Sequence, residues 1–321
     1  MPVIAVDGGG TRCRFAVMDA RGSQLAYLET ATCHPGQIGI EAMGERLSAG
    51  ARRVCAEADV SLADCVVSLG LAGYGPGRQR PLDQAVRRGL GDARSLLVIS
   101  DAEAARLGAL EGAEGLLLVA GTGSICTGVI DGAWVRAGGW GFMLGDEGSG
   151  AWLGKAAASY VLRAADGRVE KDQPLEDRLC EALDIQKPQD LVERLAQAAD
   201  ARRLLGTLAP VVMGLASEGD RAAGSLVEQA ACQLASLVSG CLRQAEPQQS
   251  VACSYTGGLF SAGALLLEPL KARLDKRVRL VAPRHSPLYG AWLHARMTLG
   301  GAGALEVQGL GCRGQGLLGN G

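Results

Sequence analysis

The chain has 321 residues, of which 48% are hydrophobic and 21% charged, and its formal net charge is −2. This length predicts two domains or one large two-lobed unit, and the composition excludes a chain that is disordered throughout. Lysines and arginines (32) nearly balance aspartates and glutamates (34). Because the basic pairs are scattered, no nucleic-acid partner is indicated. No apolar run is long enough to cross a bilayer, so no membrane partner is expected either.

Cysteine usage narrows the class of protein further. The ten cysteines contain no C-x-x-C spacing, and only three histidines accompany them. Neither a structural zinc site nor an iron–sulfur motif is therefore indicated. Most cysteines lie in apolar segments, where they are expected to be buried and reduced. The acidic Asp7 lies where a signal peptide would need its apolar region, so we expect a cytoplasmic protein.

The first part of the chain alternates strands and helices. We expect a strand at residues 3–6, the turn Gly8-Gly9-Gly10-Thr11 and a second strand at 13–19, because β-branched runs flank the glycines. The following patterns predict a helix at 41–58, a strand at 66–71, a helix at 78–90 and a strand at 96–99. Such alternation predicts an α/β fold with a mixed sheet.

The same order of elements then returns. A strand at 116–120 leads into Gly121-Thr122-Gly123-Ser124, a strand at 125–130 and the turn Asp131-Gly132. Strand, glycine turn, strand and Asp turn is also the order from residue 3 to residue 22. This repeat predicts two lobes of related topology.

The remaining chain is expected to be mostly helical. Helical patterns fill residues 147–242, and a strand at 251–255, a helix at 262–274 and a last helix at 287–298 follow. We expect an N-terminal lobe at 1–115, a C-terminal lobe at 116–298 and a flexible glycine-rich tail at 299–321, with the helix 287–298 able to pack back on the first lobe. Two G-x-G-x-x-G matches lie in the tail without the strand and helix that a dinucleotide site needs, so we discard them.

The two glycine turns are candidate phosphate-binding loops. Glycine lets backbone amides approach an anion, a threonine adds a hydroxyl donor, and Asp7 offers an oxygen to a hydrated cation. An ordinary tight hairpin explains either turn alone about equally well, since such turns favour glycine. Their occurrence as a pair favours a polyphosphate site with a bound metal.

Two acidic residues, Asp101 and Asp146, are further candidates for a functional site. Asp101 comes directly after the strand 96–99, where a carboxylate can face a ligand, although Ser100 and Glu103 also fit a helix capping box. Asp146 lies in the segment 138–150, which holds six glycines and Trp140. A helix N-cap explains Asp146 alone, but it does not explain the glycines, so we interpret this segment as a ligand-facing loop.

Thr256-Gly257-Gly258 lies at a strand-to-helix junction. A Gly-Gly pair at this point can admit a flat adenine and ribose against the backbone. A helix entry with Ser261 as cap is the other interpretation, and the two are equally supported.

Together these segments resemble the N-acetylglucosamine kinase branch of the BadF/BadG/BcrA/BcrD ATPase family, within the actin and hexokinase superfamily. The resemblance covers residues 1 to about 298. Four ordered motifs carry it: Asp7-Gly8-Gly9-Gly10-Thr11, Ser100-Asp101-Ala102, Gly121-Thr122-Gly123-Ser124, and Gly139-Trp140-Gly141 through Asp146-Glu147-Gly148-Ser149.

This resemblance implies a two-lobed, actin-like (ribonuclease H-like) α/β fold with a duplicated mixed-sheet core and a ligand cleft between the lobes. It implies an ATP-dependent kinase that transfers the γ-phosphate to the 6-hydroxyl of N-acetylglucosamine or glucosamine, with Mg²⁺ as cofactor, and it is compatible with a homodimer. Asp101 would be the catalytic base and Asp7 the water-mediated magnesium ligand. The implied ATP contacts are Gly9, Gly10, Thr11, Gly121, Thr122, Gly123, Gly257 and Gly258. The implied sugar contacts are Cys33, Asp101, Gly139, Trp140, Gly141 and Asp146.

Cys33 departs from the family pattern. The animal N-acetylglucosamine kinases resembled here place an Asn at this position, and it contacts the sugar. A thiol cannot reproduce the paired donor and acceptor of an amide. Free glucosamine therefore stands beside N-acetylglucosamine as a candidate substrate.

Two other functions remain open on the same fold. One is an ATPase activator of an acyl-CoA dehydratase, which would hold an iron–sulfur cluster between subunits through paired cysteines such as Cys126 and Cys180. The other is a non-catalytic, sugar-sensing regulator. The loop from Trp140 to Ser149 argues against the first function, and the intact Asp101 argues against the second.

Overall fold

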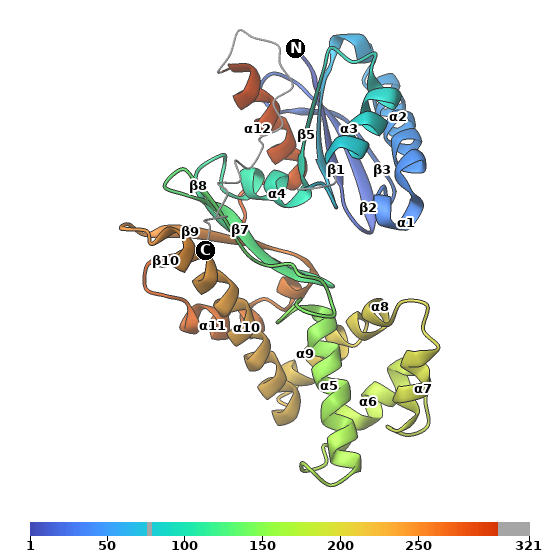
Figure 1. Cartoon of the computed structure of the whole chain (residues 1–321), viewed down its shortest axis with the longest axis vertical. Coiled ribbons are helices and arrows are strands. Elements are labelled where there is room, and N and C mark those ends of the chain that lie inside the picture. Colours follow the sequence, from blue (N-terminus) through green and yellow to red (C-terminus); the bar gives the residue numbers. More distant parts are fainter. Residues whose placement is uncertain (76–78, 301–321) are drawn as a thin grey trace, which may run out of the picture. The chain divides into compact units, whose positions relative to one another are not determined.

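The computed structural model describes residues 1–75 and 79–300 and forms two compact units. Unit 1 comprises Met1–Ala113 and the chain from Arg284 onward, and unit 2 comprises Glu114–Pro283 (Figure 1). Unit 1 thus contains the last described helix, which the sequence analysis assigned to the second lobe. The G-x-G-x-x-G matches lie outside the described residues, as does Arg78, the expected start of a helix.

Unit 1 contains a five-stranded mixed sheet in the order β3-β2-β1-β4-β5. Its strands are β1 (Val3–Gly8), β2 (Arg12–Met18), β3 (Gln24–Ala31), β4 (Val66–Leu71) and β5 (Ser95–Ser100). Strands β1, β4 and β5 run parallel, whereas β2 and β3 are antiparallel to their neighbours. Every residue of β1 and β4 is buried, as expected for central strands covered on both faces.

Helices cover both faces of this sheet. They are α1 (Pro35–Ile38), α2 (Ile40–Glu57), α3 (Gln79–Leu90), α4 (Asp101–Ala109), α12 (Pro287–Gly300) and the 3-10 turn η1 (Leu62–Asp64). Ile4 and Val6 of β1 pack in the core with α2 and α3, while Val3 and Ala5 pack with α4 and α12. Alternate residues of one strand thus serve two cores. Leu299 and Gly300, which we expected in the tail, are the last residues of α12.

Unit 2 repeats this topology, with a sheet in the order β10-β9-β6-β7-β8. Its strands are β6 (Gly115–Ala120), β7 (Ser124–Ile130), β8 (Ala133–Gly138), β9 (Val251–Thr256) and β10 (Val278–Leu280). Strand β6 takes the place of β1, since it is antiparallel to β7 and parallel to β9. The expected duplicated mixed-sheet core is confirmed.

A helical region between β8 and β9 makes unit 2 the larger unit (Figure 1). Its helices are α5 (Gly150–Ala165), α6 (Gln173–Leu183), α7 (Asp190–Ala196), α8 (Ala201–Gly206), α9 (Ala209–Ser217) and α10 (Arg221–Ala245). The turn η2 (Gly258–Ala262) and α11 (Ala264–Arg273) follow β9. Leu234 and Val238 of α10 are fully buried in the core of this unit.

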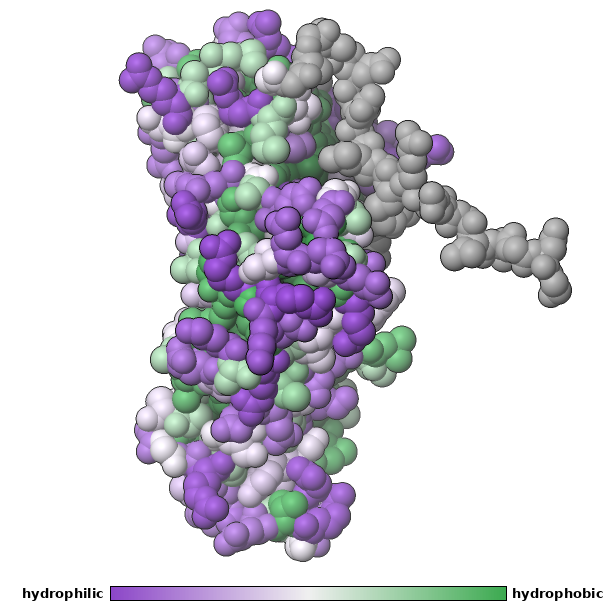
Figure 2. Space-filling view, turned by 90° about the vertical axis from the view of Figure 1, so that its left-hand side faces the viewer, coloured by the Kyte–Doolittle hydropathy of each residue, from purple (hydrophilic) through white to green (hydrophobic). Residues whose placement is uncertain are grey.

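Hydrophilic residues cover most of the face shown in Figure 2, with smaller hydrophobic areas among them. Within residues 1–75 and 79–300, no helix combines the length and apolarity that crossing a membrane requires. Three of the most exposed large hydrophobic side chains belong to one loop: Trp140, Met143 and Leu144 are 70%, 85% and 84% exposed. This loop is the glycine-rich segment that the sequence analysis singled out.

Candidate functional site

In unit 1, two acidic residues lie at one edge of the sheet. Asp7 is near the end of β1 and pairs in register with Gly70 of β4, which pairs with Ile99 of β5. Asp101 follows β5 directly, as the first residue of α4. Because the three strands are parallel, their carboxyl ends share one edge, which is where ligands bind in sheets of this kind.

Asp7 is a buried carboxylate with one charged partner. It is 8% exposed, and Arg14 Nη1 donates to its Oδ2 at 3.1 Å. Burial raises the pKa of Asp7, and the charge of Arg14 opposes that rise. Arg14 Nε is also 3.1 Å from Glu29 Oε2, and Glu29 Oε1 accepts from Arg12 Nη1 at 3.0 Å. Asp7 thus lies at the end of a charged network along β2 and β3.

The loop after Asp7 borders a cavity of about 330 Å³, lined by Asp7, Gly9, Gly10, Thr11, Arg12 and Arg14. Neighbouring side chains fix this loop: Thr32 Oγ1 donates to the Gly9 carbonyl at 3.1 Å, and Gln37 Nε2 donates to the Gly10 carbonyl at 2.8 Å. A cavity that combines backbone glycines, a hydroxyl and two guanidinium groups suits an anion.

Asp101 is both a helix residue and a perturbed acid. Its Oδ1 accepts a hydrogen bond from Ala102 N at 2.9 Å. Burial raises the pKa of Asp101, and the nearby charge of Asp7 raises it further. The expected capping box is half formed: Ser100 Oγ accepts from Glu103 N, but the Glu103 carboxylate pairs with Arg106 instead. Ser100, and not Asp101, therefore caps the helix. The raised pKa of Asp101 suits a proton acceptor.

Cys33 is buried beside Gly8, at the start of the glycine loop. It is 1% exposed, and its thiol donates to Cys13 Sγ at 3.1 Å. A Cβ atom added at Gly8 would lie 2.7 Å from Cys33 Sγ, so the thiol occupies the space that Gly8 leaves free. Its side chain packs against the loop, and its role in sugar binding stays a prediction.

In unit 2, the turn Gly121–Ser124 joins β6 to β7 and is anchored on two sides. Gly150 N, at the start of α5, donates to the Gly121 carbonyl at 2.8 Å, and Ala151 N donates to the Thr122 carbonyl at 3.3 Å. On the other side, a Cβ atom added at Gly257 would lie 2.3 Å from the Ala120 carbonyl oxygen. The structure thus brings two of the predicted motifs, at 121–123 and 257–258, into direct backbone proximity.

Asp146 lies beside this turn. It is 3% exposed and adopts a left-handed backbone with φ of 61°, a conformation that is uncommon for residues other than glycine. Its Oδ1 accepts from Ser124 N at 3.3 Å, and Arg202 Nη2 lies 2.9 Å from its Oδ2. Ser149, not Asp146, caps α5, since its hydroxyl accepts from Trp152 N. The helix-cap interpretation of Asp146 is therefore wrong.

The loop before Asp146 exposes Trp140 between two glycines. Gly139 and Gly141 have φ of 70° and 84°, values that favour glycine. Arg136 packs over the Trp140 ring at 5.2 Å and donates from Nη2 to the Gly139 carbonyl at 2.8 Å. An exposed indole on a loop fastened in this way can pack against a sugar ring.

Three arginines, two in unit 1 and one in unit 2, contact the candidate motifs but were not predicted as site residues. Arg12 and Arg14 line the phosphate-loop cavity, and their position two and four residues after Gly10 could have indicated them. Arg202 reaches Asp146 from α8, and no local pattern connects these two positions.

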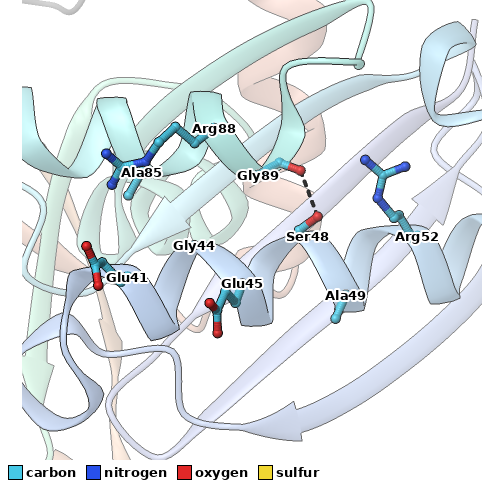
Figure 3. Close-up of a pocket in the computed structure, with 9 residues that line it drawn as sticks. All are labelled: Glu41, Gly44, Glu45, Ser48, Ala49, Arg52, Ala85, Arg88 and Gly89. Atoms are coloured by element: carbon cyan, nitrogen blue, oxygen red, sulfur yellow. Dashed lines mark hydrogen bonds between the residues drawn. The ribbon is translucent and has the colours of Figure 1, made fainter.

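A larger cavity of about 580 Å³ lies away from these motifs, between α2 and α3. Figure 3 shows Glu41, Glu45 and Arg52 on one helix and Arg88 on the other. Its floor is a close helix contact, because Ser48 Oγ donates to the Gly89 carbonyl at 2.7 Å and Gly89 packs on the Gly44 backbone. Since Asp7 lines the smaller cavity and does not line this one, we interpret the larger cavity as a helix-packing groove and place the site at the smaller one.

The cysteines give no support to an iron–sulfur site. Cys126 is buried beside Cys241 and Cys253 in the core of unit 2, whereas Cys180 is on α6 and half-buried. Over the described ranges 1–75 and 79–300, no three Cys, His, Asp or Glu residues are grouped so that they could hold a metal.

Known proteins resemble this chain over most of its length. The BadF/BadG/BcrA/BcrD ATPase family matches residues 4–295. The chain belongs to this family. The N-acetylmuramic acid/N-acetylglucosamine kinase of Clostridium acetobutylicum is 27% identical over 92% of this chain and 98% of its own length. The glucosamine kinase of Vibrio cholerae is 28% identical over 72% of this chain and 77% of its own length.

Among solved structures, a candidate N-acetylglucosamine kinase from Chromobacterium violaceum superposes with a TM-score of 0.73. It is 29% identical, and the match covers 91% of this chain and 98% of that one. The resemblance to a two-lobed sugar kinase of this ATPase family is confirmed.

Proposed function

We propose that the protein is an ATP-dependent amino-sugar kinase that transfers the γ-phosphate of ATP to the 6-hydroxyl of glucosamine or N-acetylglucosamine. Membership of the ATPase family and kinase relatives that match over most of their length support this activity. The structural observation that carries it is the placement of Asp7 and Asp101 at one edge of the unit 1 sheet, where Asp7 lines the cavity of the first candidate phosphate loop.

In unit 1, Asp101 is proposed to accept the proton of the attacking hydroxyl. Its raised pKa matches this role, because a base works best when its pKa lies near the working pH. Gly9, Gly10 and Thr11 would bind phosphate oxygens through amides and the Thr11 hydroxyl. Arg12 and Arg14 add positive charge to the same cavity, and phosphoryl transfer depends mainly on positioning and charge neutralisation.

In unit 2, Gly121, Thr122 and Gly123 are proposed to bind further phosphate oxygens, and Gly257 and Gly258 to border the adenosine. The backbone proximity of these two segments supports their action on one nucleotide. Trp140, flanked by Gly139 and Gly141, and Asp146 would bind the sugar. The exposure of Trp140 and the burial of Asp146 suit an aromatic platform and a fixed hydroxyl acceptor, respectively.

Magnesium is proposed as the cofactor, held through water by Asp7. Mg²⁺ keeps several waters and binds through one or two carboxylates together with substrate phosphates. One buried carboxylate beside a phosphate loop fits this preference. When bound, the ion would neutralise charge on the phosphates, and the ion pair with Arg14 would orient the Asp7 carboxylate that holds it.

A coupled assay of ADP release over glucosamine, N-acetylglucosamine, N-acetylmuramic acid and glucose tests the proposal. We expect turnover with at least one amino sugar and a product with its phosphate on the 6-oxygen. The proposal fails if none of the four sugars increases ADP release above the rate with ATP alone.

A further inference from the structure

One arginine outside the four motifs reaches into two of them. Arg202 is on α8, and its Nη2 lies 2.9 Å from Asp146 Oδ2. The same helix lies close to the second phosphate loop, because a Cβ atom at Gly206 would be 3.4 Å from Thr122 Cγ2. Arg202 therefore lies where the proposed sugar-binding and phosphate-binding segments of unit 2 meet.

Asp146 needs a partner of opposite charge. Only 4% of its side chain is exposed, and its Oδ1 accepts one hydrogen bond, from Ser124 N. A buried carboxylate is costly unless it is paired. Arg202 supplies that charge and forms an ion pair with Asp146.

Gly123 leaves the space that the ion pair between Arg202 and Asp146 occupies. A Cβ atom added at Gly123 would lie 2.2 Å from Arg202 Nη2 and 2.6 Å from Asp146 Oδ1. The pair therefore occupies space that only a glycine at this position leaves free. This requirement ties the composition of the second phosphate loop to the position of Arg202.

The pair retains unused hydrogen-bonding capacity. Although Arg202 Nη2 is at ion-pair distance, the contact lacks hydrogen-bond geometry, and among the described residues Asp146 Oδ2 and Arg202 Nε have no hydrogen-bond partner. Such buried, unsatisfied atoms are rare in folded proteins. A carboxylate oxygen that is ion-paired but accepts no hydrogen bond from the described residues keeps the acceptor capacity that a sugar hydroxyl needs.

We propose that Arg202 is a positioning residue for the amino sugar: it holds Asp146 in place with Oδ2 available to accept a hydrogen bond from a sugar hydroxyl. This inference rests on the proposed kinase function. The Arg202 side chain is 42% exposed, so its guanidinium has room to shift toward solvent when the hydroxyl approaches Oδ2. Arg202 thus acts on the sugar through Asp146.

The experiment compares steady-state kinetics of the wild type with Arg202→Ala, Arg202→Lys and Arg203→Ala. Arg203 is the matched control, since it is the next residue of the same helix and is exposed. For Arg202→Ala we expect the KM for the sugar to rise about tenfold or more, with kcat and the KM for ATP within about threefold, because a binding interaction is lost. Arg202→Lys should recover part of the sugar affinity, and Arg203→Ala should match the wild type.

A double-mutant cycle separates positioning from a general structural effect. If Arg202 acts through Asp146, adding Arg202→Ala to Asp146→Asn should not raise the sugar KM further. Additive effects would overturn the proposal, and so would a rise confined to the KM for ATP, which would assign Arg202 to the phosphate loop. Thermal unfolding sets an assay temperature at which every variant is folded.

The two proposals fail in different ways. If the wild type phosphorylates no amino sugar, the proposed function fails and this inference fails with it. If the wild type is active and Arg202→Ala keeps the wild-type sugar KM, only the role of Arg202 is wrong.

Discussion

Asp7 is the next-to-last residue of β1, Asp101 directly follows β5, and Gly70 of β4 lies between these two parallel strands. Asp7 pairs with Gly70, and Gly70 pairs with Ile99, two residues before Asp101. A Cβ atom at Gly70 would lie 2.6 Å from Ala104 Cβ, so the glycine lets α4 pack closely on β4. Two carboxylates at one edge influence each other's ionisation, and the charge of Asp7 adds to the effect of burial on Asp101.

Asp101→Asn tests the proposed base. We expect turnover to fall by about 10²–10⁴-fold, the usual contribution of a positioned base, while ATP binding is retained. The free energy of unfolding of Asp101→Asn should not fall with its turnover and should instead stay equal or rise. Burial raises the pKa of Asp101 above 3.8 in the folded state, so the ionised side chain costs stability once the pH exceeds that raised pKa.

Asp101→Asn should therefore unfold at an equal or higher temperature than the wild type at pH 8. The difference in unfolding temperature should shrink toward pH 4. Calorimetry at both pH values measures it. Near-normal turnover would show that Asp101 serves only the start of α4.

Arg14→Gln tests the support of Asp7. Without the guanidinium, the pKa of Asp7 should rise further, because the remaining influence is burial. We expect the Mg²⁺ concentration for half-maximal rate to rise about tenfold, as is typical when the partner of a metal-binding group is removed. Arg12→Gln is the control, since Arg12 lines the same cavity and also pairs with Glu29, but its ion pair does not include Asp7. Equal effects in both variants would show that only the net charge of the cavity matters.

Gly257→Ala tests the contact between the adenosine and phosphate segments. Gly257 has φ of 113°, and an added Cβ would lie 2.3 Å from the Ala120 carbonyl oxygen. We expect a loss of about 1–3 kcal/mol in the free energy of unfolding, the cost of a strained backbone, together with a higher KM for ATP. At Gly258 an added Cβ meets open space, so Gly258→Ala should leave stability nearly unchanged. Urea unfolding of both variants distinguishes these sites.

His294 predicts an acid sensitivity of unit 1. Ser68 Oγ lies 3.2 Å from His294 Nδ1 on α12, and burial lowers the pKa of His294 from 6.5, partly opposed by Glu103. The folded state thus favours the neutral ring, so stability is complete above pH 6.5 and is lost as the pH falls toward the lowered pKa. The slope for one proton is at most about 1.4 kcal/mol per pH unit.

His294→Gln should remove this part of the pH dependence, because an amide can still hydrogen-bond Ser68 but does not titrate in this range. Urea unfolding of both proteins between pH 8 and pH 5 tests the expectation. Parallel stability profiles would show that another group is responsible.

The central strands and the edge strand β5 were predictable, whereas the edge strands β3, β8 and β10 were not. Strands β1 and β6 read as unbroken hydrophobic runs because the sheet is covered on both faces. Strand β3 is largely exposed, and β10 has three residues, so neither has a hydrophobic pattern to recognise. Strand β8 was not predicted either. It also lacks a hydrophobic pattern, since even its Trp134 is 47% exposed.

Some residues of the candidate site were also predictable from the sequence, and others were not. Asp7 and Asp101 were predictable, because each is close to the carboxyl end of a strand that the sequence predicts, although β5 is only partly buried. Arg202 was not, because its contact with Asp146 depends on how α5 and α8 pack. Long-range packing of this kind leaves no periodic signal in the chain.

The chain order of unit 1 has a consequence for biosynthesis. Unit 2 is continuous, whereas unit 1 requires α12 from the far end of the chain. Until the ribosome has released α12, Val3, Ala5 and Ala104 lack the helix that buries them. A nascent or truncated chain that ends before Pro287 therefore exposes a hydrophobic sheet face, a target for chaperones and a starting point for aggregation.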